Sequence, residues 1–218
     1  MMMVSQYHAI GDKHKVIKEL PTALVEKSNV RVAIAPRVKD ARVLDLTCGT
    51  NFFSRLLIDW GAASVVGVDL SPAMVVVAER EAKALDPAVA SRMRYHAGDA
   101  VTLGQVDPQG KGFYHAIGAW LLNYAGDEEE LAAMFATIAA NLNGPDSVFV
   151  GIATPPAARD GMDAFAVKVN DPISQKKLSE LLRVAPSYYA RNDRMPEGEG
   201  GWRVELTSVD NPDVSFRN

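Results

Sequence analysis

Short apolar runs alternate with stretches of helical spacing up to about residue 153. Val43, Leu44 and Leu46 form a run typical of a strand buried on both faces, and the apolar residues of Phe52–Trp60 follow with helical spacing. The same alternation predicts further strands over residues 64–68, 94–97, 113–122 and 147–153. Strands separated by helices favour an α/β fold, a doubly wound and mostly parallel sheet with helices on both faces.

Capping residues mark where two of the helices begin. Ser71 followed by Pro72 is typical of an N-cap and a first helical position, so a helix is expected to start there. Asp127 is expected to cap another helix, with Glu130 closing a capping-box-like pair, and this helix is expected to end near Asn143.

The start of the chain carries a weaker helical pattern. Residues 1–36 are predicted to form an N-terminal helical segment or lid, and residues 37–218 are predicted to complete a single domain overall. A helix is expected over 22–34, and its partial apolar stripe consists of Leu24, Val25, Val32 and Ile34. A solvated helix packed on the sheet edge is the alternative to a lid.

Beyond Pro155 the signals weaken, and the C-terminal part is expected to be shortened. A helix is predicted near 173–184, and the chain is predicted to end in a β-hairpin of strands over 202–208 and 214–216. Either this hairpin or a partner chain, for example in a homodimer, is expected to cover the open edge of the fifth strand.

Residues suited to ligand binding fall where the predicted strands end. Asp45 stands inside an apolar run, where a carboxylate is costly without hydrogen bonds, so it is expected to face the turn that follows. Gly49 lets the backbone approach a ligand, and the first amides of the next helix are expected to point at the same place. Asp69 follows Gly49 at the separation usual for a carboxylate that binds a ribose.

Three ordered motifs resemble those of the class I S-adenosylmethionine-dependent methyltransferases. Asp45-Leu46-Thr47-Cys48-Gly49-Thr50-Asn51 resembles their first motif, Val68-Asp69-Leu70-Ser71 their second acidic motif, and Ala97-Gly98-Asp99-Ala100 their adenine-contacting motif. The resemblance covers residues 7–152. Two positions depart from it, because Thr47 stands where relatives keep a small residue and Asn51 where they often have a Gly at positive φ. Asn tolerates that left-handed conformation better than most residues.

The resemblance implies an enzyme that binds S-adenosylmethionine, releases S-adenosylhomocysteine and methylates a small metabolite or natural product. The cofactor-binding residues that it implies are Asp45, Thr47, Cys48, Gly49, Asn51, Asp69, Leu70, Met74, Gly98, Asp99, Ala100 and Trp120. Tyr7, Asn123 and Tyr124 are the implied substrate residues. Met74 and Cys48 also suit a purely structural role in the core, and Asp99 that of a turn residue.

No catalytic residue is identified from the sequence. The cofactor brings its own leaving group, a sulfonium, so the protein mainly has to align the acceptor with the methyl group. His14, beside the predicted lid, is the least poor candidate for a base, whereas histidines 8, 96 and 115 are interpreted as strand or surface residues. No metal site is predicted.

Composition narrows the class of partner. The net charge of −4 is mild and basic residues are scattered, which argues against a nucleic-acid surface. No apolar run has membrane-spanning length, and Met1–Met3 lack the features of a signal peptide. Cys48 is the only cysteine, which favours a reducing compartment and a cytoplasmic location.

Three other functions compete with this interpretation. A nicotinamide-dependent oxidoreductase would need closely spaced glycines where Thr47 and Asn51 stand. A methyltransferase-like partner or ligand-binding subunit, with weak or lost methyl transfer, is the alternative from a different class. A base-modifying methylase would carry Pro-Pro-aromatic where this chain has residues 120–123, Trp-Leu-Leu-Asn.

Overall fold

A computed structural model describes residues 21–107, 112–153, 188–194, 202–208 and 215–217. The chain divides into two compact units, residues 1–153 and residues 154–218, and each is described by itself. The predictions for Tyr7, His8 and His14, and for a helix near 173–184, concern residues outside the described ones. The predicted boundary at residue 36 and the lid role of 1–36 stay predictions.

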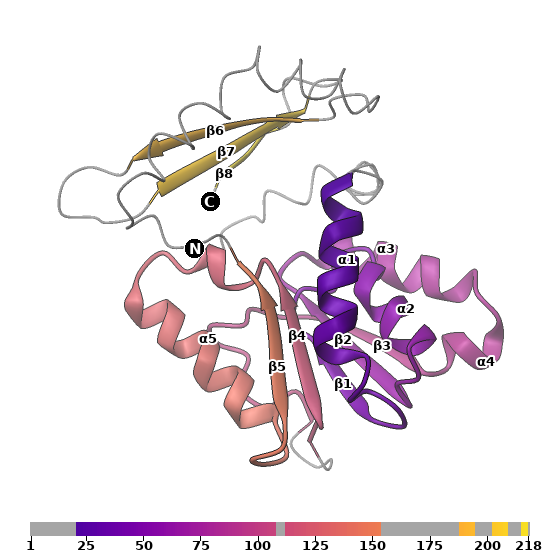
Figure 1. The fold of residues 1–218 in the computed structure, drawn as a ribbon. Coiled ribbons are helices and arrows are strands. Elements are labelled where there is room, and N and C mark those ends of the chain that lie inside the picture. The colour runs from indigo at the N-terminus through magenta and orange to yellow at the C-terminus, as the bar shows by residue number, and fades with distance from the viewer. Residues whose placement is uncertain (1–20, 108–111, 154–187, 195–201, 209–214, 218) are drawn as a thin grey trace. The chain divides into compact units, whose positions relative to one another are not determined.

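The first unit is built on a five-stranded parallel sheet (Figure 1). Its strands are β1 Arg42–Asp45, β2 Ser64–Asp69, β3 Met93–Ala97, β4 His115–Ala119 and β5 Val148–Ile152. They lie in the order β3-β2-β1-β4-β5, with Val43 paired to Val65 on one side and to His115 on the other. The direction of winding reverses between β1 and β4, which is where ligands bind in open α/β sheets.

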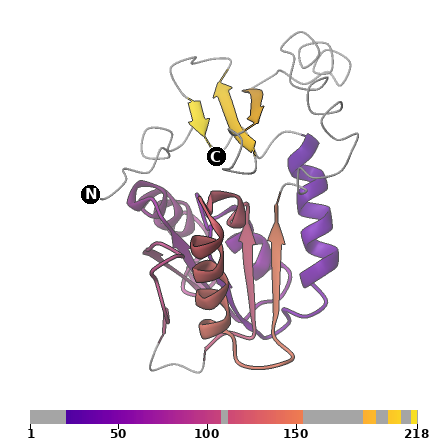
Figure 2. The same ribbon diagram turned by 90° about the vertical axis from the view of Figure 1, so that its left-hand side faces the viewer.

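Helices cover both faces of this sheet. The packed clusters place α1 Pro21–Ile34, α2 Phe52–Asp59 and α3 Pro72–Lys83 on one face, and α5 Glu128–Asn141 on the other (Figures 1 and 2). Two short elements, α4 Pro87–Ala90 and the 3₁₀ turn η3 Leu122–Tyr124, complete the unit. The predicted doubly wound α/β fold is therefore confirmed.

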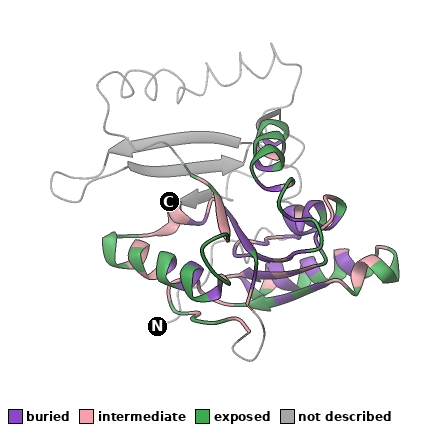
Figure 3. Cartoon of the chain, turned by 60° about the horizontal axis from the view of Figure 1, so that its bottom comes forward, coloured by how far each residue is buried: buried purple, intermediate pink, exposed green. Residues whose placement is uncertain are grey.

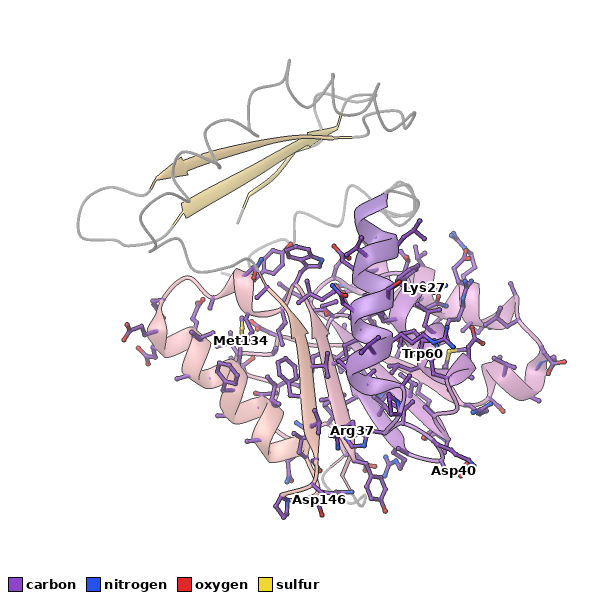
Figure 4. All side chains as sticks on the ribbon, in the orientation of Figure 1. Lys27, Arg37, Asp40, Trp60, Met134 and Asp146 are labelled. Atoms are coloured by element: carbon purple, nitrogen blue, oxygen red, sulfur yellow. The ribbon has the colours of Figure 1, made fainter. Side chains whose placement is uncertain are left out.

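The core lies in two layers, one on each side of the sheet. Val43 belongs to the layer under α1 and α2, and its neighbour Leu44 to the layer under α5, as the alternation of a strand requires. Met134, which is labelled in Figure 4, and Ile138 are the buried apolar residues of α5, whose outer side is exposed (Figure 3). Because helices cover both faces of the sheet, the side chains of the central strands are mostly apolar, and the few polar ones are hydrogen-bonded.

The predicted helix starts are confirmed in detail. The Ser71 side chain accepts a hydrogen bond from the Met74 amide at 3.4 Å, and Asp127 accepts one from the Glu130 amide at 2.8 Å. Glu130 reaches back one residue further than expected, to the Gly126 amide at 2.8 Å.

The predicted apolar stripe of α1 is mostly wrong. Leu24, Val25 and Val32 are 61%, 59% and 79% exposed, and the packed face consists of Ala23, Val30 and Ile34. The packed residues are spaced by seven and four positions, so they share one side of the helix, and the three exposed residues lie on the opposite side.

The strand predicted over 113–122 is shorter than expected. Phe113 forms only an isolated bridge with Leu142, and β4 ends at Ala119. Trp120 has a φ of 69°, which no continuing strand can accommodate, and the chain turns from there into η3.

The second unit contains a three-stranded antiparallel sheet in the order β6-β7-β8. Its strands are β6 Tyr188–Arg194, β7 Trp202–Ser208 and β8 Ser215–Arg217, with Leu206 paired to Ala190 and to Phe216. The predicted final hairpin is therefore confirmed, whereas β6 was not predicted. In the part of the chain that the structure describes, no helix has the length and apolar character needed to cross a bilayer.

Candidate functional site

The loop after β1 is tied to the strands on both sides of it. The Leu46 amide donates to the Ile117 carbonyl of β4 at 2.9 Å, and the Cys48 amide donates to the Val68 carbonyl of β2 at 3.0 Å. Residues 46–51, which we call the β1 loop, therefore lie at the carboxyl edge of the sheet, at its switch point.

Asp69 joins the β1 loop to the end of β2. One carboxylate oxygen accepts a hydrogen bond from the Gly49 amide and the other accepts one from the Ser71 amide, each at 2.9 Å. Since a carboxylate offers about four lone-pair sites, these two bonds leave capacity for hydroxyl donors of a ligand.

The charge of Asp69 is held by those same amides. Burial raises the pKa of the Asp69 carboxyl, and the hydrogen bonds from Ser71 and Gly49 oppose that shift. The two amides therefore stabilise the ionised form, which is the better acceptor for ribose hydroxyls.

Asp45 lies beneath the β1 loop. It is 1% exposed, accepts a hydrogen bond from the Ser54 hydroxyl at 2.7 Å and a longer one from the Thr47 amide at 3.4 Å. The expectation that Asp45 faces the following turn is confirmed. Its place, however, is that of a support for the loop and the start of α2.

Two residues beneath the loop were not predicted from the sequence. Ser54 is fully buried, and Tyr95 has a pKa raised by burial, with hydrogen bonding to Ser54 and Asn51 opposing that shift. The available signal was Ser54 itself, a polar residue within the apolar face of α2, one helix position after Phe53.

Asn51 adopts the left-handed conformation expected for this position. Its φ is 76°, and its side-chain amide donates to the Ala78 carbonyl of α3 at 3.2 Å. Asn51 is 2% exposed, so its side chain lies inside the protein against α3.

The Thr47 side chain also makes a hydrogen bond to a neighbouring strand. Its hydroxyl donates to the Ala119 carbonyl at the end of β4, at 2.9 Å. Thr47 and Asn51, the two departures from the family motif, therefore hydrogen-bond the β1 loop to β4 and to α3.

Open backbone and an apolar surface adjoin Asp69. A side chain at Gly49, where φ is 50°, would meet no atom nearer than 4.0 Å, so the backbone there is accessible. Leu70 is 53% exposed directly after Asp69. The Asp69 carboxylate fits the hydroxyls of a nucleoside. The open backbone at Gly49 and the exposed Leu70 side chain fit its flat base.

The amides of the β1 loop are less available than the sequence suggested. Those of Cys48, Gly49 and Asn51 already donate to Val68, Asp69 and Cys48 respectively. These three amides are therefore engaged within the protein, and the cofactor-binding role predicted for their residues stays a prediction. The accessible backbone at Gly49 remains as the contact surface.

The loop after β3 brings Asp99 to the same edge. The Gly98 amide donates to the Asp69 carbonyl at 2.9 Å, and Asp99 accepts a hydrogen bond from the Val101 amide at 2.9 Å. A Cβ at Gly98 would lie 2.6 Å from a methyl carbon of Leu103, so the Leu103 side chain would have to shift to admit it. Asp99 is thus a turn residue held beside Asp69.

Three of the predicted cofactor residues are buried in the core. Cys48, Met74 and Ala100 are 3%, 1% and 7% exposed. Burial raises the pKa of the Cys48 thiol, and the charges of Asp45 and Asp69 raise it further, so the thiol stays protonated. These buried side chains pack beneath the loops and support their conformation.

The predicted cofactor residue Trp120 and the predicted substrate residues Asn123 and Tyr124 follow β4 at the same edge of the sheet. Trp120 directly follows the strand and its amide donates to the Ile152 carbonyl of β5 at 2.8 Å. Asn123 and Tyr124 form part of η3 and are half-buried. Tyr7 lies outside the described residues.

His115 lies at the opposite end of the sheet. It begins β4, where one ring nitrogen lies 3.1 Å from the Arg37 carbonyl and the other accepts a hydrogen bond from the Val148 amide at 3.2 Å. Burial lowers the pKa of His115. It is a neutral structural residue, and His96 is exposed on β3. Among the described residues, no group of three or more His, Cys, Asp or Glu side chains could hold a metal ion.

The sequence of the first unit matches a known family. Residues 43–144 match the family described as "Methyltransferase domain", and this segment spans β1 to the end of α5. Together with the fold, the match identifies residues 43–144 as a methyltransferase domain of the class I, Rossmann-like type. The predicted family is thereby confirmed for this segment of the chain.

Individual proteins are similar to parts or most of the chain. A solved structure of a protein from Pyrococcus horikoshii OT3 has a TM-score of 0.58 and 26% identity, and the match covers 90% of this chain and 74% of that one. An S-adenosylmethionine dependent methyltransferase from Mesorhizobium loti is 31% identical, with a TM-score of 0.42, over 52% of this chain and 47% of that one. An uncharacterized protein of Haemophilus influenzae is 38% identical over 58 residues, which are 27% of this chain and 22% of that protein.

The chain thus matches less than half the length of the Mesorhizobium loti and Haemophilus influenzae proteins. The reaction of the whole chain, its acceptor and its partners are therefore matters for proposal.

Proposed function

We propose that this protein transfers the methyl group of S-adenosylmethionine to a small-molecule acceptor. The observation that carries the proposal is the position of Asp69, which bonds the Gly49 and Ser71 amides beside an accessible backbone and the exposed Leu70. This arrangement suits a ribose and its base, and it occurs in a domain of the methyltransferase family.

Each part of the cofactor would have its own group of residues. Asp69 would accept the ribose hydroxyls, Leu70 would pack against the adenine face, and Asp99 would accept from the adenine amino group. The backbone at Gly49 would lie against the methionyl part. The cofactor, when bound, supplies an activated methyl group on its sulfonium.

The protein's own part in the reaction is alignment and exclusion of water. Trp120, Asn123 and Tyr124 follow β4 at the same edge as Asp69, so they are proposed to line the acceptor site. No described histidine is placed as a base, since His115 lies at the other end of β4 and His96 is exposed. Methyl transfer to an acceptor that is already nucleophilic needs no such base.

The acceptor is proposed to be a metabolite or a natural product. The net charge of −4 and the absence of a Pro-Pro-aromatic sequence at 120–123 argue against nucleic acid. A cytoplasmic location is proposed from the single, buried and protonated thiol of Cys48.

Calorimetric titration with S-adenosylmethionine and with S-adenosylhomocysteine tests the proposal. Asp69→Asn keeps the shape of the side chain but removes a charged acceptor, and it is expected to weaken binding by about 1.5–3 kcal/mol. Asp86→Asn is the matched control, because Asp86 caps the short α4 and Asn caps equally well. Equal affinity of the wild type and Asp69→Asn would exclude Asp69 from the site.

The same calorimetric titration tests the rival cofactor, a nicotinamide dinucleotide. A nicotinamide dinucleotide is expected to release no heat with the wild-type protein. Tight binding of that dinucleotide, without binding of the sulfonium compound, would overturn the proposal in favour of an oxidoreductase.

The non-enzymatic alternative concerns the edge of the sheet. Among the described strands, β5 pairs with β4 alone, so its outer edge has room for a further strand. We propose a second copy of this chain as its partner. Light scattering combined with a methyl-transfer assay separates the cases: an active homodimer supports the enzyme, and a chain active only with a different protein supports a partner subunit.

A further inference from the structure

The Thr47 hydroxyl extends the contact between β1 and β4 beyond the end of β1. The paired register of these strands ends at Asp45 and Ile117, and the Leu46 amide adds a bond to the Ile117 carbonyl. Two residues further along β4, the Thr47 hydroxyl donates to the Ala119 carbonyl at 2.9 Å. A side chain thus replaces the backbone bond that β1 no longer supplies.

The peptide group between Ala119 and Trp120 is consequently held at both ends. Its carbonyl accepts the Thr47 hydroxyl, and its amide, that of Trp120, donates to the Ile152 carbonyl at 2.8 Å. A peptide plane with both polar groups bonded to neighbouring segments cannot rotate without losing one of them.

This fixed peptide precedes a strained residue. Trp120 has a φ of 69°, in the left-handed region, which is an outlier for so bulky a side chain. Such conformations persist where the surroundings enforce them, and they concentrate at functional sites.

The left-handed conformation changes the face to which Trp120 belongs. Along β4, Ile117 and Ala119 join the core layer under α2, while Ala116 joins the layer under α5. Strand alternation would send Trp120 toward α5, but its side chain packs against the α2 layer, which contains Cys48 of the β1 loop. The indole is therefore on the side of the sheet where the β1 loop enters α2.

We propose that Thr47 is a positioning residue that holds Trp120 in this conformation, so that the indole forms a specificity-determining wall of the acceptor site. The inference rests on the proposed function, because an acceptor site exists at this edge only if the cofactor binds there. It also gives Thr47 a role other than the cofactor contact expected from the sequence.

Fluorine NMR of protein labelled with 5-fluorotryptophan tests both parts. The chain has three tryptophans, and the resonance that disappears in Trp120→Phe is that of Trp120. Thr47→Val removes the hydroxyl while keeping the shape of the side chain, and Thr47→Ser keeps the hydroxyl. Thr137→Val on α5 is the control for the same exchange at a buried threonine away from the β1 loop.

The expected result is a shift of the Trp120 resonance in Thr47→Val without ligand, and the wild-type position in Thr47→Ser and Thr137→Val. Saturating S-adenosylmethionine is expected to move the Trp120 resonance of the wild type and to leave that of Trp60 in place.

Two results would overturn the inference, and they differ from failure of the proposed function. An unchanged Trp120 resonance in Thr47→Val would remove Thr47 as a positioning residue. A wild-type Trp120 resonance unaffected by bound cofactor would remove Trp120 from the site. If Thr47→Val does not fold, Thr47→Ala is measured in its place. If the wild type shows no heat with S-adenosylmethionine, the proposed function fails, while the ligand-free comparison still tests the link between Thr47 and Trp120.

Discussion

The Ser54 hydroxyl donates a hydrogen bond to the Asp45 carboxylate at 2.7 Å, and both residues are buried beneath the β1 loop. This bond joins the first helical turns of α2 to the last residue of β1. A carboxylate at 1% exposure depends on such donors, because water cannot replace them.

Ser54→Ala is therefore expected to lower the free energy of unfolding by about 1.5–3 kcal/mol, the range for a bond to a charged group. Urea denaturation measures the change. Ser91→Ala removes an exposed hydroxyl and is expected to change stability by no more than about 0.5 kcal/mol. Equal stability of the two variants would show that the Ser54 bond contributes nothing.

The left-handed conformation of Asn51 predicts an order of stability among its variants. Asn51→Gly loses the bond to Ala78 but suits a φ of 76°, so a loss of about 1 kcal/mol is expected. Asn51→Ala loses the same bond and adds about 1–2 kcal/mol of backbone strain. Thermal or urea unfolding of both variants gives the difference, and equal stabilities would contradict the positive φ.

Gly49→Ala separates backbone strain from ligand access. Its Cβ would meet no atom of the described residues nearer than 4.0 Å, so only about 1–2 kcal/mol of left-handed strain is expected in the free protein. Affinity for S-adenosylmethionine is expected to fall roughly tenfold or more, because the added methyl group occupies the surface where the ligand approaches.

Gly104→Ala provides the matched comparison for that variant. Gly104 has a φ of 60°, and a methyl group added there would meet no atom of the described residues within 4 Å, so it carries the same kind of strain outside the β1 loop. Its stability is expected to fall by a similar amount and its cofactor affinity to stay at the wild-type value. Calorimetry that finds both variants equally impaired in binding would contradict the role of Gly49.

His115 makes stability depend on pH. The folded protein lowers the pKa of His115 below its ordinary value of 6.5, so folding favours the neutral ring that bonds Arg37 and Val148. This contribution is fully present above pH 6.5 and is lost as the pH falls through the lowered pKa. Urea unfolding at about pH 5 and about pH 7.5 is expected to show the loss in the wild type.

His115→Gln is expected to flatten this pH dependence, whereas His96→Gln, at an exposed position of β3, is expected to retain it. If stability changes equally with pH in the wild type and in His115→Gln, the pH dependence comes from other groups.

Sequence patterns predicted most of the first unit because its local signals agree with the final packing. The runs around Val43, Ser64 and Arg94 became strands, and the Ser71-Pro72 start became α3. The confirmed family also follows from three motifs whose order reflects consecutive strand ends. Asn51 could be placed in the left-handed region because the motif demands it.

What the sequence did not predict depends on contacts between distant segments. Thr47 and Ala119 are 72 residues apart, and nothing local indicates their hydrogen bond or the conformation of Trp120. The stripe of α1 was misassigned because Ala23 contributes to packing although it is weakly hydrophobic, while Val32 is exposed. The roles of the predicted site residues in binding remain predictions until a ligand is measured.

The strand order has a consequence for how the molecule assembles. β1, β2 and β3 come from one continuous stretch, whereas β4 joins β1 from much later in the chain, so we expect residues 42–97 to associate before the β1–β4 seam closes. A nucleoside that touches both sides of this seam would slow its opening. The Leu46 amide, which bonds Ile117 across the seam, is then expected to exchange its hydrogen more slowly with ligand present, and unchanged exchange would place the ligand on one side alone.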